Sequence, residues 1–210
     1  MFNKANICSL IIILFHFVGL YGFLNPELSH LFVELVPLHL LLMLLLMMIS
    51  GYDKSTHFQV FAVVVYAAGF LVEVAGVNTG LIFGSYTYGR TLGTQIWNTP
   101  ILIGANWLIL VYTTGVLLNV YTLNKYILAF LGAGILVGID FLIEPIAIKY
   151  DYWSWDRGVI PLQNYIGWFV VAFFMFLIFD KLNFRKQNSS AIVLFVAQLC
   201  FFIILNWWST

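Results

Sequence analysis

Charged residues are scarce in this chain of 210 residues. Only 9% of the residues are charged, whereas a soluble domain carries about 25%. Hydrophobic residues make up 62%, and the mean hydropathy is +0.98. Nine basic and nine acidic residues balance, so no strong net field attracts a charged partner. These figures exclude a soluble domain, a disordered chain, a coiled coil and a nucleic-acid-binding domain. They indicate a polytopic membrane protein.

Residues that hold metals and cofactors are also few. The two cysteines, Cys8 and Cys200, both fall in apolar stretches, so we expect them to pack against other side chains and not to form a disulfide or a metal pair. No Cys/His cluster has metal-ligand spacing, no glycine motif suits a phosphate, and no Ser/His/Asp set is present. The sequence therefore predicts no metal and no cofactor. His16 and His39 also lie in apolar stretches, where we expect packing or hydrogen bonding; a facing pair with a proton or metal role remains open.

Seven apolar stretches have about the 20 residues that a spanning helix needs. We expect an all-α fold, a transmembrane helical bundle of about seven spans that forms a single integral-membrane domain over residues 1–210. No Ala-x-Ala-like site follows the first stretch, so we expect a retained helix and not a cleaved signal. The predicted spans are residues 7–23, 31–49, 58–77, 101–120, 126–148, 165–180 and 190–208.

Basic residues in the loops predict the orientation, because cytoplasmic loops are enriched in them. Six lie on the side of the N-terminus and three on the opposite side, where Arg90, Lys149 and Arg157 fall. The prediction is a multi-pass protein of the cell (inner) membrane with a cytoplasmic N-terminus. The six are Lys4, Lys54, Lys125, Lys181, Arg185 and Lys186.

Acidic residues inside the predicted spans are the exception to the scarcity of charge. An acid at mid-membrane costs about 2.5–3.5 kcal/mol, so such residues are candidates for function. Glu34 begins a span, and we expect it to reach water or cap a helix. Glu73, Asp140 and Glu144 are predicted to lie at one depth, and the last two, four residues apart, share a helix face. The spans contain no Lys or Arg. We therefore predict that these three acids are catalytic.

Two unusual loops follow these acids. Each loop holds an aromatic-x-aromatic pair, Tyr86/Tyr88 in the first and Trp153/Trp155 in the second, and each holds one arginine. An interfacial aromatic belt would explain scattered rings. It would not explain why these rings accompany acids at the same depth. We therefore favour a pocket lined by these side chains, with Arg90 and Arg157 facing water.

The helices after the two loops open alike. Pro100 precedes Trp107 by seven residues, and Pro161 precedes Trp168 by seven. Proline suits the first turn of a helix. The pattern suggests an internal duplication of helix, aromatic loop and helix about an axis along the membrane normal, although a chance match would look the same.

Acids beside aromatic rings suggest a definite chemistry. A carboxyl group buried away from water can hold its proton near neutral pH and act as a general acid. Ring faces can stabilise a developing cation. In an apolar cavity this combination suits the protonation of a polyene, after which water adds, a ring closes or a proton leaves. None of these steps needs a redox cofactor.

The order of these residues resembles the integral-membrane carotenoid biosynthesis proteins, a family that includes carotenoid 1,2-hydratases and bisanhydrobacterioruberin hydratases. The resemblance covers roughly residues 60–180. Glu144 stands where the family pattern has aspartate, which keeps a carboxyl group there. The first block is Glu73-x-x-Gly76-x-x-Thr79-Gly80-x-x-Phe83-Gly84-x-Tyr86-x-Tyr88, then Leu92-Gly93, Pro100 and Trp107. The second is Asp140-x-x-x-Glu144-Pro145-x-Ala147, then Trp153-x-Trp155, Ile160-Pro161-x-x-Asn164-Tyr165 and Gly167-Trp168.

The resemblance implies a cofactor-independent hydratase. It would add water across the C1=C2 double bond of an acyclic carotenoid ψ-end group, with a lipophilic substrate taken from the bilayer and other enzymes of the pathway as candidate partners. Glu73 or Glu144 would protonate C2, and Asp140 with Asn164 would position or deprotonate the water. The substrate-binding residues would be Tyr86, Tyr88, Trp107, Trp153, Trp155, Asn164 and Trp168.

Two alternatives stay open at this point, and the sequence argues against a third. A membrane lycopene cyclase starts with the same protonation and ends in ring closure. A transporter would also place acids in the membrane. A retinal-binding photoreceptor needs a lysine in the last helix, and residues 190–208 contain none.

Overall fold

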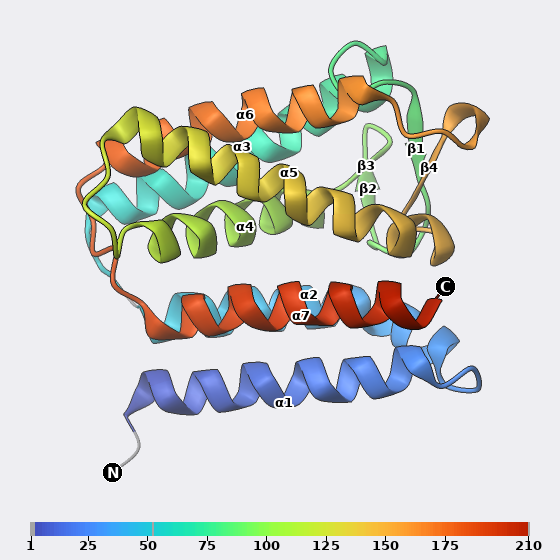
Figure 1. Ribbon diagram of the computed structural model, residues 1–210, viewed down its shortest axis with the longest axis horizontal. Coiled ribbons are helices and arrows are strands. Elements are labelled where there is room, and N and C mark those ends of the chain that lie inside the picture. The colour runs from blue at the N-terminus through green and yellow to red at the C-terminus, as the bar shows by residue number, and fades with distance from the viewer. Residues whose placement is uncertain (1–2, 52, 210) are drawn as a thin grey trace.

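The computed structural model describes residues 3–51 and 53–209 and is predominantly helical (Figure 1). The predicted all-α bundle of about seven helices is confirmed, and each helix agrees with its predicted span within three residues at either end. Six helices are long and apolar enough to cross a membrane, and the seventh, α4, is apolar but shorter. The helices are α1 (Lys4–Leu24), α2 (Ser29–Ser50), α3 (Thr56–Thr79), α4 (Leu102–Leu118), α5 (Lys125–Lys149), α6 (Leu162–Lys181) and α7 (Ser189–Ser209).

Local sequence signals place the ends of several helices. The side chains of Asn3, Ser55 and Asn124 accept backbone N–H groups in the first turns of α1, α3 and α5, which satisfies donors that have no partner within the helix. Gly80 ends α3 in the left-handed conformation, with φ of 66°. Pro161 immediately precedes α6. These signals end α3 and start α6 at the same end of the bundle.

Helix α4 is the centre of the bundle. It packs against α2 and α7 on one side and against α3, α5 and α6 on the other, while α1 lies outside α2 and α7 (Figure 1). Nearly all of its residues are buried. Its 17 residues span about 26 Å, less than the roughly 30 Å of a bilayer core. A central helix can be shorter because the other helices separate it from lipid.

Short strands replace the irregular loops that we expected at one end of the bundle. Strand β1 (Tyr86–Tyr88) pairs antiparallel with β4 (Trp153–Trp155), and β2 (Gln95–Ile96) pairs with β3 (Thr99–Pro100). One 3-10 turn, Asp156–Gly158, follows β4. The alternation in Tyr-x-Tyr and Trp-x-Trp is the period of a strand, so the signal was present in the sequence.

The strands define what we call the strand end of the bundle. The α1–α2 connection and the C-terminus also lie there, whereas the N-terminus lies at the opposite end (Figure 1). Opposite termini are expected for an odd number of spans. Cys8 is buried and Cys200 is exposed, and both are free.

Candidate functional site

Glu73 lies near the end of α3 and accepts three hydrogen bonds. Its Oε2 accepts from the hydroxyls of Tyr86 and Tyr88, at 2.5 and 2.8 Å. Its Oε1 accepts from Nε1 of Trp107 at 2.9 Å. Burial and the Glu73 carboxyl group raise the pKa of both tyrosines, which lie in β1 outside the spans. Both tyrosines therefore stay protonated and donate.

The position of Trp107 depends on a glycine one turn before Glu73. A Cβ on Gly69 would lie 2.6 Å from Cβ of Trp107, which is closer than two carbon atoms can approach. Glycine therefore lets α4 approach α3 until the indole of Trp107 reaches Glu73. Trp107 is fully buried.

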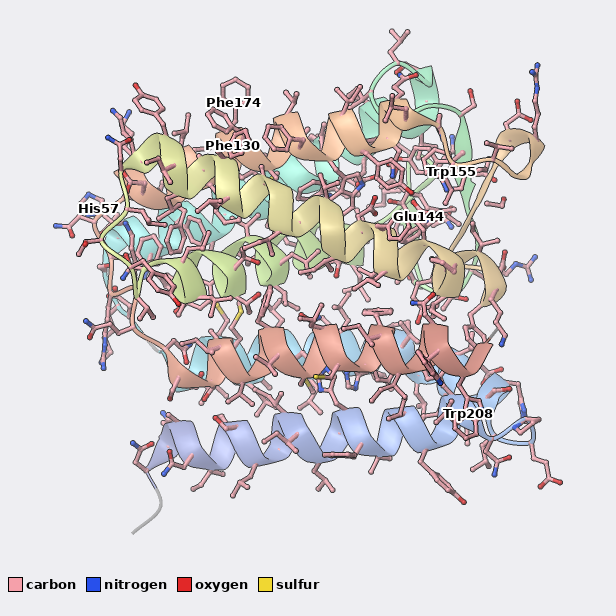
Figure 2. The ribbon with its side chains drawn as sticks, viewed as in Figure 1. His57, Phe130, Glu144, Trp155, Phe174 and Trp208 are labelled. Carbon is pink, nitrogen blue, oxygen red and sulfur yellow. The ribbon has the colours of Figure 1, made fainter. Side chains whose placement is uncertain are left out.

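Glu144 forms the second half of the site on α5. Its Oε2 accepts from Nε1 of Trp153 at 3.0 Å and from Nε1 of Trp155 at 2.8 Å. Figure 2 shows Glu144 beside Trp155 at the strand end. Asn164, in the first turn of α6, donates to Oε1 of Glu144 at 3.4 Å and to Oδ2 of Asp140 at 2.7 Å. One amide therefore links the two carboxyl groups.

The three carboxyl groups differ in how fully they are bonded. Each is at most 3% exposed. Both oxygens of Glu73 and both of Glu144 accept at least one donor, and so does Oδ2 of Asp140. Oδ1 of Asp140 is buried, and no donor contacts it within the described residues. Among the six oxygens of the three carboxyl groups, this one alone accepts no hydrogen bond from a described residue.

The two aromatic pairs meet because their strands pair. Tyr86 lies opposite Trp155 and Tyr88 opposite Trp153, so all four rings are on the same face of the two-stranded sheet. The rings of Tyr86 and Trp155 are 5.1 Å apart between centroids. Each pair donates to the acid of its own block, the tyrosines to Glu73 and the tryptophans to Glu144. The two blocks therefore have the same plan.

The two tryptophans at matching positions also meet. Trp107 and Trp168 stack with ring centroids 4.2 Å apart and planes 21° apart. Among the described residues, Trp168 is the one predicted site aromatic without a hydrogen bond to a carboxyl group. A two-fold axis between the two blocks would bring corresponding parts into contact, as β1 contacts β4 and Trp107 contacts Trp168. These contacts support our interpretation of an internal duplication.

The remaining charged candidates lie outside this network. Arg90, Arg157 and Glu34 are all exposed. Nε of Arg157 lies 3.9 Å from Oδ2 of Asp156, and both side chains are exposed. Contact of these three side chains with water therefore stays a prediction. Within residues 3–51 and 53–209, no group of three or more His, Cys, Asp or Glu residues could hold a metal ion.

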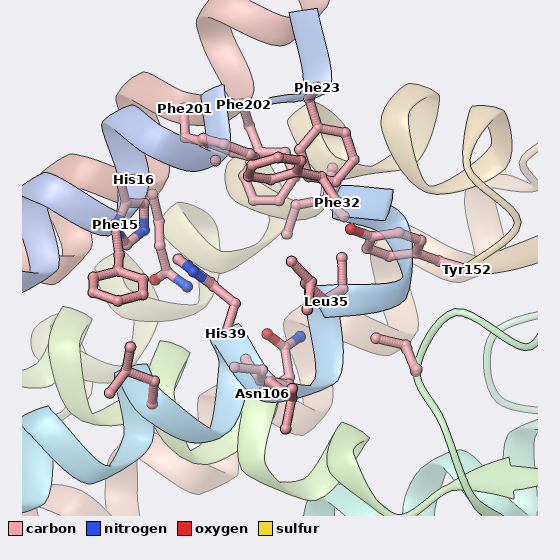
Figure 3. A pocket seen from close by; sticks show the side chains of 18 of the residues that line it. Phe15, His16, Phe23, Phe32, Leu35, His39, Asn106, Tyr152, Phe201 and Phe202 are labelled. Atoms are coloured by element: carbon pink, nitrogen blue, oxygen red, sulfur yellow. The ribbon is translucent and has the colours of Figure 1, made fainter. Parts of the chain in front are cut away.

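A cavity of about 390 Å³ lies within the bundle (Figure 3). It differs from the pocket expected from the sequence, because Trp153 is the one member of the two aromatic pairs among its lining residues. Its lining comes from α1, α2, α4, α5 and α7 together with Leu92, Tyr152 and the first residue of β4, Trp153, and it is mostly apolar. Ile139 and Ile143, which precede Asp140 and Glu144, line it, as does Trp153. Trp153 therefore both lines the cavity and donates to Glu144. The first two helices, which carry none of the sequence pattern, supply about half of the walls.

The chain matches the carotenoid biosynthesis protein family over residues 35–209. The match is wider than the predicted 60–180 and includes part of α2. The chain is also 28% identical, over 142 residues, to the bisanhydrobacterioruberin hydratase of Haloarcula japonica. That alignment covers 61% of this chain and 46% of the relative, so the chain spans about half of that protein's length. No solved structure matches the chain.

Proposed function

Because the chain belongs to the family of carotenoid biosynthesis proteins, we propose that it is a hydratase that adds water across the C1=C2 double bond of an acyclic carotenoid end group. The similarity to a hydratase supports the reaction class, and it covers only part of that relative. The observation that carries the proposal is the group of three buried carboxyl groups bonded by indole, phenol and amide donors. Such a group suits proton transfer to an apolar substrate.

Asp140 is the proton donor in this proposal. Every oxygen of Glu73 and Glu144 already accepts a hydrogen bond, and these bonds favour the carboxylate form of both groups. Oδ1 of Asp140 has no such bond and can carry the proton. This assignment replaces our first expectation, in which Glu73 or Glu144 was the acid and Asp140 acted on the water.

Glu144 and Asn164 act on the water. Protonation at C2 forms a C–H bond and leaves a tertiary cation at C1. The water oxygen bonds to C1, and its proton passes to a carboxylate. Glu144 is suited to accept it, because Asn164 holds Glu144 next to Asp140. The proton then returns to Asp140, so the net reaction adds one water and consumes no cofactor.

The aromatic residues shield the cation from bulk water. Trp153 lines the cavity and donates to Glu144, so its ring would face the reacting end of the substrate. Ring faces stabilise cations, most strongly those of tryptophan. The other aromatic residues hold the Glu73 half of the site in place. Tyr86, Tyr88 and Trp107 donate to Glu73, and Trp168 stacks on Trp107.

Expression in a host that makes lycopene tests the proposal. We expect a pigment whose mass is higher by one water, and we expect Asp140→Asn to lower its formation at least about 100-fold, the usual lower range for loss of a general acid. Glu73→Gln and Glu144→Gln should also lower it. Glu34→Gln is the matched control, because Glu34 is exposed, and it should leave hydration unchanged.

Three results would contradict the proposal. Full hydration by the Asp140, Glu73 and Glu144 variants would show that these groups do not form the site. A pigment of unchanged mass with a new ring would indicate a lycopene cyclase, which shares the first step. Changed distribution of a substrate with no new pigment would indicate a transporter.

A further inference from the structure

Four polar side chains from four helices converge in the cavity described above. They are His16 of α1, His39 of α2, Asn106 of α4 and Gln198 of α7. Figure 3 shows His16, His39 and Asn106 pointing into the same space. The rings of His16 and His39 are in edge contact, with centroids 5.0 Å apart. None of the four belongs to the carboxyl network.

These polar groups have unused hydrogen-bonding capacity. Nδ1 of His16 donates to the carbonyl of Ile12 at 2.8 Å, which leaves Nε2 as an acceptor in the neutral ring. Oε1 of Gln198 is buried with no partner in the described part of the chain. The side chains of His39 and Asn106 likewise make no hydrogen bond to any described residue.

Such a group of polar side chains is costly inside a membrane bundle. A polar group in an apolar environment without a partner costs several kcal/mol, on the order of 2–7 by small-molecule transfer. Intramembrane polar residues commonly mark the path of a substrate or ligand. A purely structural group would bond to itself or to backbone, and only His16 does so here. The unused positions therefore point to a bound molecule.

The rest of the cavity restricts the chemistry of that molecule. The other walls are mainly aliphatic and phenylalanine side chains, so the body of the ligand is hydrocarbon. The free atoms of His16 and Gln198 are acceptors, so the ligand must donate a hydrogen bond. A hydroxyl donates one and can accept from Asn106, whereas a ketone or ether cannot donate. The volume, about 390 Å³, lies in the usual range for ligand sites.

The cavity is elongated and reaches the surface of the bundle. His16 and Phe23 both line it and are seven residues apart on α1, so the cavity extends about 10 Å toward the strand end. Trp153, which donates to Glu144, is also among its lining residues. Leu38 of α2 lines it and is 63% exposed, so the cavity reaches the surface at α2.

We propose that this cavity binds an isoprenoid alcohol, with the hydroxyl held by His16, His39, Asn106 and Gln198 and the hydrocarbon chain directed toward Trp153. The inference goes beyond the proposed hydratase and does not depend on it, because it concerns binding alone. A molecule that already carries one hydroxyl would thereby be preferred over its hydrocarbon counterpart.

Binding of tritiated geranylgeraniol to the full chain in lipid nanodiscs tests this proposal. The competitor is the hydrocarbon in which CH3 replaces CH2OH. We expect the alcohol to bind about tenfold more tightly than the hydrocarbon, as one net hydrogen bond allows. Gln198→Leu and Asn106→Leu should each remove most of this preference while leaving the hydrocarbon affinity within about twofold.

Control variants separate binding from folding. Gln198→Leu removes an atom without a partner, so its unfolding midpoint should stay the same or rise. Asn206→Leu, on the same helix, removes hydrogen bonds to Leu142 and Phe202; it should lower the midpoint and keep the preference for the alcohol. Gly19→Leu fills the cavity and should weaken both ligands, since only Phe201 lies within 4 Å of the added Cβ.

Equal affinity of the native protein for alcohol and hydrocarbon would overturn the proposal, and so would an unchanged preference in both the Gln198 and Asn106 variants. In those cases water would occupy the polar positions. Loss of hydratase activity in the host assay has no bearing on this result, because no turnover is measured.

Discussion

The hydrogen bond between Trp155 and Glu144 can be measured by a double-mutant cycle. Nε1 of Trp155 lies 2.8 Å from Oε2 of Glu144, and both side chains are buried. Trp155→Phe removes the donor and keeps an aromatic ring, and Glu144→Leu removes the acceptor. The coupling energy in the cycle isolates the pair from the packing that each substitution also changes.

The expected coupling depends on the charge of Glu144. A hydrogen bond to a charged group contributes about 1.5–3 kcal/mol, and a neutral one about 1 kcal/mol. Side-chain hydrogen bonds measured in a membrane bundle average about 0.6 kcal/mol, with a maximum near 1.7. Trp153 donates to the same oxygen and still binds it when Trp155 is replaced. Because the proposed mechanism has Glu144 as a carboxylate, we expect a coupling of about 1.5–2 kcal/mol, whereas about 1 kcal/mol would indicate a protonated Glu144.

Unfolding in mixed micelles, followed by tryptophan fluorescence, measures the four proteins of the cycle. Trp168→Phe with Glu144→Leu is the control cycle, because Trp168 stacks on Trp107 and makes no hydrogen bond to Glu144 within the described residues. The control should be additive within about 0.5 kcal/mol. A coupling that small for Trp155 and Glu144 would refute the hydrogen-bonded network as an element of stability.

Two further predictions concern packing and pH. Gly69→Ala should destabilise the protein by about 1–3 kcal/mol and reduce hydration, because its Cβ would push Trp107 away; Gly138→Ala, with nothing within 4 Å, should be neutral or stabilising by up to about 1 kcal/mol. Thermal unfolding and the pigment assay measure both, and equal effects of the two would contradict the close approach. In the α2–α3 loop, hydrogen bonds from the backbone N–H groups of Arg185 and Ser55 lower the pKa of Asp53. A lowered pKa in the folded state contributes stability at neutral pH that is lost as the pH falls through it, so Asp53→Asn should unfold with a flatter pH dependence below about pH 4. An unchanged slope there would contradict that contribution.

The fold class was predictable because lipid constrains the chain so strongly. Apolar length alone located seven helices, and the capping residues Asn3, Ser55 and Asn124 account for where three of them begin. The same constraint made acids conspicuous, so Glu73, Asp140 and Glu144 were identified before any contact was known. The aromatic pairs were identified by their order along the chain. Both pairs also show the two-residue alternation of a β-strand, but we had interpreted these segments as loops.

The tertiary structure decided what local pattern cannot encode, since contacts between distant segments depend on packing. The antiparallel register of β1 and β4 placed Tyr86 opposite Trp155, and Gly69 allowed Trp107 to reach Glu73. Only the three-dimensional contacts distinguished Asp140, whose Oδ1 has no donor, from the two glutamates. The cavity and its polar group required α1 and α2, whose residues follow no motif. Scarcity of charge identified a membrane protein with three exceptional acids; packing decided which hydrogen bonds those acids make.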